Sequence, residues 1–231
     1  MYGKLPKIDA AMISFVNVDC TFGGRGGIAE ASFALNQGEF LFLTGPSGSG
    51  KSTILRLIYM DLFPEKGRVI FRNYSSHKIR TWEIPYLRRR IGMVFQDFRL
   101  LRDRTVFQNV ALSLYVSRYK TREIKRRVHS VLEQVGLGDR VYYRPEELSG
   151  GEQQRVVIAR ALIKEPDVIL ADEPTGNLDQ RVSLGLMNLL QKINEGGTAV
   201  IFATHNYSLI PRIPGARLMQ LDNGQITRLT E

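Results

Sequence analysis

The chain has 231 residues, 43% of them hydrophobic and 24% charged, which is the composition of a globular protein long enough to bury a sizeable core. No stretch approaches the roughly 20 apolar residues of a membrane-spanning helix, and the first ten residues lack the apolar segment of a signal peptide, so we expect a soluble chain that stays where it is made. The single cysteine, Cys20, excludes an internal disulfide framework and fits a reducing cytoplasm.

An excess of basic residues gives the chain a net charge of +9. Clusters of them stand at 88–90, 99–104 and 125–127. The simplest interpretation of each cluster is a solvated face, and the alternative is an anionic membrane surface, where each basic residue close to the lipid contributes about 1 kcal/mol. Aromatic residues are not interleaved with the clusters as in platforms that stack single-stranded nucleic acid, so no nucleic-acid partner is expected.

The first third of the chain is typical of strands around a glycine-rich loop. Alternating apolar and polar residues indicate strands, and apolar residues at helical spacing after the loop indicate a helix. In chain order, we predict strands at 12–18, 31–36 and 39–44, a turn at 36–38, a loop at 45–50, a helix at 51–59 and a strand at 67–71.

From about residue 83 to 138 the pattern changes to helical segments, broken by a short strand at 91–95. A long amphipathic helix is predicted at 121–135, with Thr121 as its N-cap. The remainder returns to alternation, with a helix at 152–164, a strand at 168–171, a helix at 180–194 and a strand at 198–203. Strand, helix and strand in this order predict a parallel α/β sheet in one domain, 1–231, with a helical subdomain at approximately 83–165.

The glycine-rich loop matches the phosphate-binding pattern G-x-x-x-x-G-K-[ST] at 45–52, between a predicted strand and a predicted helix. Backbone N–H groups must wrap a polyphosphate, and bulky side chains would block that approach. The helix that begins near Lys51 directs its positive end at the anion. We expect Lys51 to reach the terminal phosphates of ATP and Ser52 to ligate Mg²⁺. The nucleotide-binding candidates here are Gly45, Pro46, Ser47, Gly48, Ser49, Gly50, Lys51, Ser52 and Thr53.

Two carboxylates, Asp172 and Glu173, end the apolar strand at 168–171. In a P-loop enzyme this is the position of the Asp that holds the metal, so Asp172 is the candidate metal ligand. Glu173 follows at the carboxyl end of the strand, where ligands bind in open α/β sheets. We expect it to polarise the attacking water as a general base. Without the phosphate loop, two exposed acids would be the better interpretation.

A second loop of small residues lies at 148–155, at the start of another predicted helix. By the same physics it is a second anion site, although a helix cap without a ligand is the alternative. Because one nucleotide rarely needs two cradles, we expect Ser149, Gly150 and Gly151 to bind the nucleotide of a second copy. This predicts a homodimer with ATP sandwiched between the two chains.

The octapeptide at 148–155 resembles the signature motif of the ABC ATPase family, and other family motifs follow in register. The resemblance implies a P-loop NTPase core of mostly parallel sheet, an N-terminal antiparallel β region and an inserted helical subdomain. It also implies that Gln96, in the Q-loop, touches Mg²⁺ and the attacking water, that His205 contacts the γ-phosphate, that residues 177–179 form the D-loop with Asp179, and that Phe22 stacks on adenine.

Within the family, the segments 85–90 and 91–106 resemble the subunits of bacterial cell-division complexes. The resemblance implies a peripheral place on the cytoplasmic face of the inner membrane. It also implies an FtsX-like polytopic partner docking near Gln96 to Val110, and activation of cell-wall hydrolases without movement of a solute. Met60 and Asn206 depart from the usual Gly and Asp of the family, and neither residue is expected to take part in the chemistry.

Two alternatives share part of this pattern. The ATPase subunits of lipoprotein-releasing and macrolide-efflux transporters would have the same catalytic residues, and only the membrane partner separates them from the cell-division subunits. A soluble ABC protein acting on nucleic acid is less consistent, because the stretch between Lys51 and Leu148 contains no long heptad run of the kind that such proteins insert.

Overall fold

A six-stranded sheet forms the centre of the computed structural model, which describes residues 11–23, 26–176 and 178–230. Its strand order is β10-β9-β3-β8-β7-β6. All neighbours are parallel except β9 and β10, which form an antiparallel hairpin at one edge. The strands are β3 (Phe40–Thr44), β6 (Ile91–Val94), β7 (Val168–Asp172), β8 (Ala199–Thr204), β9 (Arg217–Asp222) and β10 (Gln225–Leu229).

A second, antiparallel sheet has the order β2-β1-β4-β5. It contains β1 (Ile13–Thr21), β2 (Gly27–Leu35), β4 (Lys66–Phe71) and the two-residue β5 (Tyr74–Ser75). The inward residues of β1 and β2 are fully buried, and the rings of Phe15 and Phe33 stack at a centroid distance of 4.4 Å. The predicted antiparallel region near the N-terminus is therefore present.

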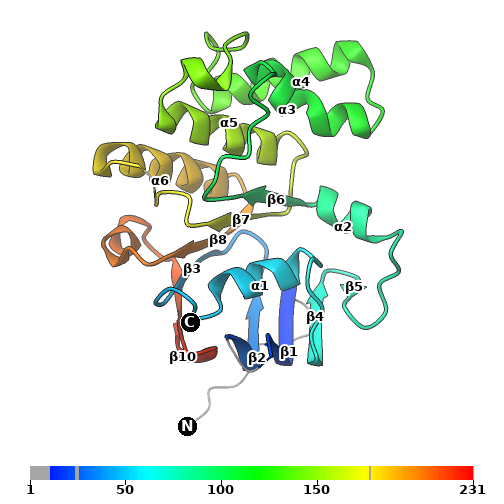
Figure 1. Ribbon diagram of the computed structural model, residues 1–231, viewed down its shortest axis with the longest axis vertical. Coiled ribbons are helices and arrows are strands. Elements are labelled where there is room, and N and C mark those ends of the chain that lie inside the picture. Colours follow the sequence, from blue (N-terminus) through cyan, green and yellow to red (C-terminus); the bar gives the residue numbers. More distant parts are fainter. Residues whose placement is uncertain (1–10, 24–25, 177, 231) are drawn as a thin grey trace.

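Helices cover both faces of the central sheet (Figure 1). They are α1 (Lys51–Ile58), α2 (Ile84–Arg89), α3 (Val106–Val116), α4 (Thr121–Gln134), α5 (Gly150–Leu162) and α6 (Gln180–Glu195), with 3₁₀ turns at Pro145–Glu147 and Tyr207–Arg212. One hydrophobic core joins α1 and the antiparallel sheet to the side chains of Leu41 and Leu170. The other hydrophobic core joins helices α3, α4, α5 and α6 to Phe42 and Ala171, which are next to Leu41 and Leu170 in their strands and so face the opposite side of the sheet. The central sheet therefore separates α1 from α5.

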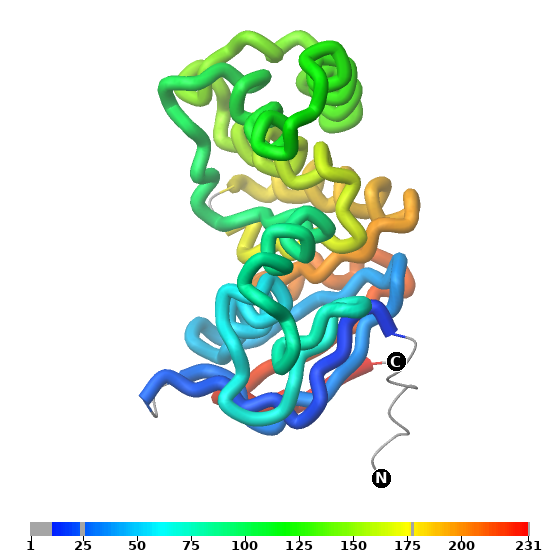
Figure 2. The backbone as a smooth tube through the Cα atoms, turned by 90° about the vertical axis from the view of Figure 1, so that its right-hand side faces the viewer, coloured from blue at the N-terminus to red at the C-terminus, as the bar shows by residue number. Residues whose placement is uncertain are grey.

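The segment from α3 to α5 forms a helical body at one end of the molecule (Figure 2). Helix α3 packs on α4 and α5, and α5 packs on α6. Together with the mostly parallel sheet and the antiparallel sheet, this arrangement confirms the predicted fold class. None of the described helices is long and apolar enough to span a membrane.

Most predicted elements are present within a few residues, and two predicted helix starts differ from the structure. Thr121 is the first residue of α4, and Lys120 is its N-cap, without a side-chain hydrogen bond. Helix α5 begins at Gly150, because Ser149 and Glu152 form a reciprocal capping box that offsets the low helix propensity of two glycines. Strands β9 and β10 were not predicted, and β9 joins the sheet by pairing with β3.

Candidate active site

The phosphate loop connects the buried strand β3 to α1. Gly45 has φ 146°, and a Cβ there would collide with the carbonyl oxygen of Leu221. Gly50, the N-cap of α1, has φ 103°, and a Cβ there would collide with the carbonyl oxygen of Gly27. No side chain caps the first turn of α1 and no acidic residue lies in it, so its N–H groups and positive end are free to meet an anion.

Lys51 is buried, with 6% of its surface exposed, and its ammonium group lies inside the phosphate loop. Its Nζ donates to the carbonyl oxygens of Gly45 (2.8 Å) and Pro46 (3.0 Å). The Oε1 of Glu173 lies 3.7 Å from the same nitrogen. The loop and the end of β7 therefore share one cation, although more than 100 residues separate them in the sequence.

Asp172 is the last residue of β7, and the described protein groups do not satisfy the hydrogen-bonding capacity of its carboxylate. Its Oδ1 is buried and has no hydrogen-bond partner. Burial raises the pKa of Asp172, and the hydroxyl of Ser52 acts in the opposite direction. A desolvated carboxylate oxygen beside a hydroxyl fits a divalent cation, which binds through one or two carboxylates and the phosphates of a nucleotide. In the part of the chain that the structure describes, no cluster of three His, Cys, Asp or Glu side chains offers a self-contained metal centre.

Glu173 and His205 come together at the ends of neighbouring strands, β7 and β8. The Oε2 of Glu173 lies 2.7 Å from Nδ1 of His205. The side chain of Glu173 is 15% exposed and that of His205 is 67% exposed. Glu173 also takes the left-handed conformation, with φ 47°, which is uncommon for a residue with a side chain and recurs at functional sites.

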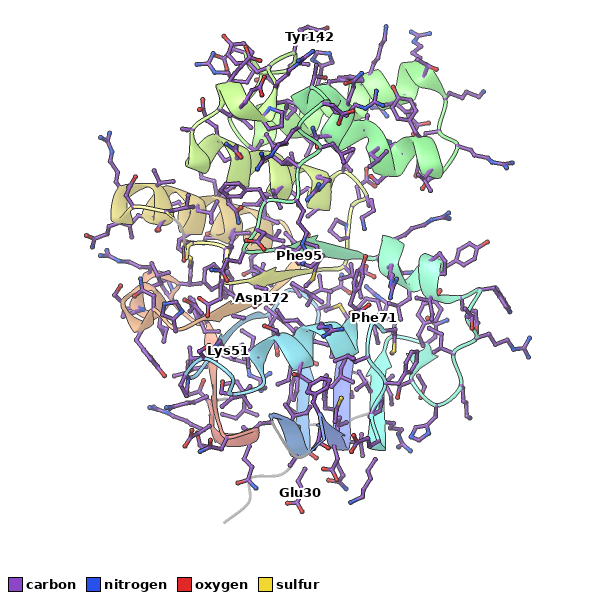
Figure 3. All side chains as sticks on the ribbon, in the orientation of Figure 1. Glu30, Lys51, Phe71, Phe95, Tyr142 and Asp172 are labelled. Atoms are coloured by element: carbon purple, nitrogen blue, oxygen red, sulfur yellow. The ribbon has the colours of Figure 1, made fainter. Side chains whose placement is uncertain are left out.

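Gln96 lies just beyond β6, and its side chain is exposed. Its amide nitrogen is 3.2 Å from the position that a Cβ on Gly176 would occupy, so the absence of a side chain at Gly176 lets Gln96 lie against the turn that follows Glu173. Figure 3 labels the three contributing places: Lys51 at the start of α1, Asp172 at the end of β7 and Phe95 after β6.

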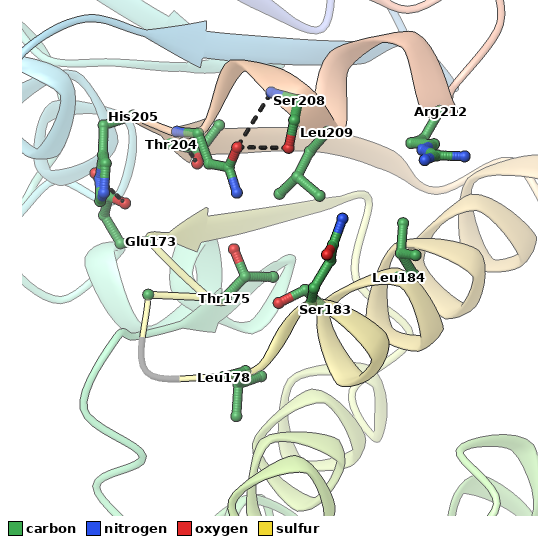
Figure 4. A pocket seen from close by; sticks show the side chains of 13 residues that line it. Glu173, Thr175, Leu178, Ser183, Leu184, Thr204, His205, Ser208, Leu209 and Arg212 are labelled. Atoms are coloured by element: carbon green, nitrogen blue, oxygen red, sulfur yellow. Dashed lines mark hydrogen bonds and ion pairs between the residues drawn. The ribbon is translucent and has the colours of Figure 1, made fainter.

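A cavity of about 320 Å³ opens beside Glu173 and His205, with the turn at Thr175 and helix α6 on one side and the segment 204–212 on the other (Figure 4). Asn206, which replaces the usual Asp, caps the 3₁₀ turn here: its Oδ1 accepts from the backbone N–H of Ser208 (3.1 Å), and its own N–H donates to Thr204 Oγ1 (2.9 Å). The loop that carries His205 is therefore ordered by short-range hydrogen bonds.

The second small-residue loop lies away from the phosphate loop of its own chain. Ser149, Gly150 and Gly151 begin α5, which is on the opposite face of the central sheet from α1 (Figure 1). Ser149 is exposed, and hydrogen bonds from its N–H and Oγ lower the pKa of Glu152. A single chain thus gathers one group of candidates, Lys51, Asp172, Glu173, His205 and Gln96. It does not bring Ser149, Gly150 and Gly151 to that group.

The remaining candidates occupy the edges of the site. Asp179 is exposed and caps α6, accepting a hydrogen bond from the N–H of Val182 (2.9 Å). Phe22, 46% exposed, follows β1 in the hairpin whose Gly27 lies against Gly50. Thr53 is buried in α1. Asn177, in the predicted D-loop, lies outside the described residues.

Sequence reasoning missed the backbone carbonyls of Gly27 and Leu221, which shape the phosphate loop from distant strands. No local pattern announces such a contact, because it depends on how β2 and β9 pack. It also missed Gly176, and the available signal was its place between Glu173 and the predicted D-loop at 177–179.

Known proteins resemble this chain along nearly its whole length. The ABC transporter family matches residues 28–176. The cell division ATP-binding protein FtsE of Escherichia coli strain K12 is 45% identical over 216 residues, or 93% of this chain and 97% of that protein. FtsE of Mycobacterium tuberculosis is 47% identical over 204 residues, or 88% of each chain.

Two solved structures of the bacterial ABC transporter cassette MJ0796 have the same fold. Its dimeric structure matches with a TM-score of 0.84 and 35% identity, covering 95% of this chain and 98% of that one. Its post-hydrolysis dimer, bound to ADP and Pi, matches with a TM-score of 0.83 and 34% identity, with the same coverage.

Proposed function

The chain belongs to the ABC transporter family, as an ATP-hydrolysing subunit, and from this premise we propose that it drives a membrane complex of bacterial cell division. The family membership confirms the predicted resemblance. The observation that carries the catalytic part is the carboxylate of Glu173, which lies between Lys51 of the phosphate loop and His205 of the neighbouring strand. The proposed unit is a single ABC ATPase domain, 1–231, whose helical subdomain spans approximately 83–165.

In the proposed site, the phosphate loop binds ATP. The N–H groups of residues 45–53 surround the phosphates, and Lys51 exchanges its contacts with Gly45 and Pro46 for phosphate oxygens. Phe22 stacks on the adenine from the β1–β2 hairpin. The bound ADP and Pi of the MJ0796 cassette support a nucleotide at this site.

The unpartnered Oδ1 of Asp172 supports a Mg²⁺ site formed with Ser52 and Gln96. The ion, when bound, neutralises charge on the phosphates. Gln96 is proposed to contact both the ion and the attacking water, and its exposed amide beside Gly176 supports this role.

Glu173 accepts the proton of the attacking water, a general-base contribution of about 10²- to 10⁴-fold. His205 is free to turn from Glu173 to the γ-phosphate, because its side chain is mostly exposed. The pairing of β7 with β8 supports these two roles, because it holds Glu173 and His205 at the ends of adjacent strands.

A homodimer completes the site. Because the central sheet separates α5 from α1, we propose that Ser149, Gly150 and Gly151 close on the γ-phosphate held by the second chain, with Asp179 beside them. The dimeric structures of the MJ0796 cassette support this arrangement.

The proposed partner is an FtsX-like polytopic membrane protein that docks near Gln96 to Val110. Asn109 orders this segment: its buried amide donates to the carbonyl oxygens of Leu101, Arg104 and Thr105 and accepts from the N–H of Leu101. The output would be activation of cell-wall hydrolases. The identity to FtsE proteins supports this partner and a peripheral place on the cytoplasmic face of the inner membrane, where exposed basic residues face anionic lipid.

Two measurements test the proposal. Glu173→Gln should retain ATP binding and lose hydrolysis by about 10²-fold or more, whereas Glu165→Gln, at an exposed ion pair with Arg127, should hydrolyse ATP normally. Tagged Glu173→Gln protein loaded with ATP is then used to capture partners from detergent-solubilised native membranes. Recovery of an FtsX-like protein supports the division function. A lipoprotein or macrolide permease in its place would refute that function and leave the ATPase, and recovery of nucleic acid alone would refute a membrane partner.

A further inference from the structure

Arg160, in the last turn of α5, donates two hydrogen bonds to the segment that follows β6, residues 95–99, which contains Gln96 and is called the Q-loop here. Its Nη1 lies 2.7 Å from the carbonyl oxygen of Arg99, and its Nη2 lies 2.9 Å from that of Phe98. These carbonyls stand two and three residues after Gln96. A guanidinium group, with its planar fork of donors, is suited to span two consecutive carbonyls.

This contact has an electrostatic cost. Burial and the charge of Arg99 both lower the pKa of Arg160. Within the described ranges, no carboxylate pairs with either arginine, and the guanidinium of Arg99 instead lies 3.9 Å from the ring centroid of Phe95. Burying part of a cation with only carbonyl partners costs free energy. We therefore take the contact to serve the backbone geometry that it fixes after Gln96.

The same Q-loop segment also touches the other end of α5. The ring of Phe98 lies 3.9 Å from the position of a Cβ on Gly150, the first residue of the helix. Arg99 adopts φ 48°, in the left-handed region. The segment is thus held against α5 at both ends, by packing at Gly150 and by hydrogen bonds at Arg160.

We propose that Arg160 is a positioning residue that ties the Q-loop backbone to α5, so that Gln96 and the Ser149–Gly151 loop move as one body. This inference rests on the proposed function, in which Gln96 serves the nucleotide of its own chain and Ser149–Gly151 serves that of the second chain. Arg160 then links the two ATP sites of the dimer through a single chain.

Three variants test the link at fixed pH. Arg160→Gln removes the fork, and Arg160→Lys keeps the charge on a group that lacks its planar geometry. Lys164→Gln is the matched control, because Lys164 lies on the same stretch of chain and donates to two other backbone carbonyls, of Arg88 and Ile91, at 2.9 Å each. The melting temperature, ADP affinity and ATPase rate as a function of ATP concentration are measured for each full chain.

Arg160→Gln should bind ADP within about twofold of wild type, because the phosphate loop lies on the opposite face of the sheet. Its kcat should fall by about tenfold or more, as expected for lost hydrogen bonds of a charged group, and its Hill coefficient for ATP should fall toward 1. Arg160→Lys should have a kcat and a Hill coefficient between those of Arg160→Gln and the wild type. Lys164→Gln should lower the melting temperature and leave kcat and the Hill coefficient near wild type.

The inference is overturned if Arg160→Gln retains the wild-type kcat and Hill coefficient, or if Lys164→Gln changes them equally. Should Arg160→Gln fail to fold, amide exchange in the Glu173→Gln chain decides: ATP should protect residues 98–104 and 149–153 together, and protection of only one segment contradicts the link. A wild-type chain without ATPase activity would refute the proposed function as well, whereas an active wild type with an indifferent Arg160→Gln refutes only this inference.

Discussion

Gly45 shows how one residue can decide whether the nucleotide site forms. Its φ of 146° suits glycine, and the carbonyl oxygen of Leu221 occupies the space of a Cβ. Because that oxygen belongs to β9, which pairs with β3, the collision cannot be relieved by a flexible side chain. The first residue of the phosphate loop is therefore fixed by a strand far away in the sequence.

Gly45→Ala should consequently lose ATP binding by about tenfold or more, because the loop must shift away from β9 and its N–H groups no longer converge. Gly215→Ala is the control: Gly215 also has a positive φ, of 77°, and nothing lies within 4 Å of its Cβ position. Binding of a fluorescent ATP analogue to both variants checks the difference. Equal affinities would show that the loop accommodates the collision with β9 without losing the geometry of its N–H groups.

At this scale the sequence predicted residues better than it predicted their contacts. Lys51 and Ser52 were identifiable because the phosphate loop is one contiguous pattern. The approach of Glu173 to both Lys51 and His205 depends on the order of β3, β8 and β7, which periodicity does not specify. The Q-loop contacts of Arg160 have no local signature for the same reason.

Among the elements, α3 and α4 begin in different ways. Thr105 caps α3 with a reciprocal pair: its Oγ1 accepts from the N–H of Gln108, and its own N–H donates to the side chain of Gln108. Helix α4 has no side-chain cap, although Thr121 looked suited to be one. Sequence alone could not decide between them, since a Thr before a helical pattern is compatible with either the N-cap or the first turn.

Thr105→Ala should lower the free energy of unfolding by about 0.5–2 kcal/mol, the usual cost of a lost N-cap. Thr121→Ala should change it by less than about 0.5 kcal/mol, as for an ordinary surface position. Urea unfolding of the two variants measures both values. A larger loss at Thr121 would place the functional cap of α4 there after all.

Lys164 joins the end of α5 to α2 and β6 by donating to the carbonyl oxygens of Arg88 and Ile91. Burial lowers its pKa from 10.5 to about 8. Between these values the unfolded chain retains a proton that the folded chain has released, so this residue makes the free energy of unfolding rise with pH through that window.

The free energy of unfolding of the wild type, relative to that of Lys164→Met, should therefore rise by about 1–2 kcal/mol between pH 7 and 9.5. Urea unfolding at both pH values gives the two differences. Lys192→Met, at an exposed position, is the control for replacing a lysine by methionine. A pH-independent difference for Lys164→Met would mean that the ammonium group is not desolvated.

The strands that sequence reasoning missed share a mixed character. Strand β9 alternates buried Met219 and Leu221 with partly exposed neighbours, and β10 is mostly exposed. Such short segments resemble surface loops until their pairing is known, since β9 becomes a member of the sheet only by lying next to β3. Strands with continuous burial, such as β3 and β8, were found because their apolar runs are unambiguous.

For the whole molecule, the decisive feature is the sheet that separates α1 from α5. In the proposed dimer each chain contributes one half of each of the two ATP sites, so activity is expected to be a property of the pair. The fold class followed from the sequence, because helices and strands alternate in order. The faces on which those helices pack did not, because handedness and strand order fix them only in three dimensions.

Two inactive variants should therefore restore activity when mixed. Gly150→Asp places a carboxylate in the Ser149–Gly151 loop, where the Cβ meets only ordinary contacts with Leu178 and Phe98 and an acid suits the first turn. In a dimer of one Gly150→Asp chain and one Glu173→Gln chain, one proposed ATP site contains both substitutions and the other contains neither. Random pairing at equal amounts should give about a quarter of the wild-type ATPase rate. A mixture as inactive as its parts would mean that each chain completes its own site.

The same separation has a genetic consequence. In a cell that expresses equal amounts of a wild-type and a Glu173→Gln copy, only about a quarter of randomly formed dimers contain two normal chains. The altered copy would remain folded and able to pair, so about half of the dimers would keep one intact ATP site and about a quarter would keep none. Such an allele should lower the mean activity per dimer to about half, whereas an allele that prevents folding, and so never enters a dimer, should leave every remaining dimer fully active.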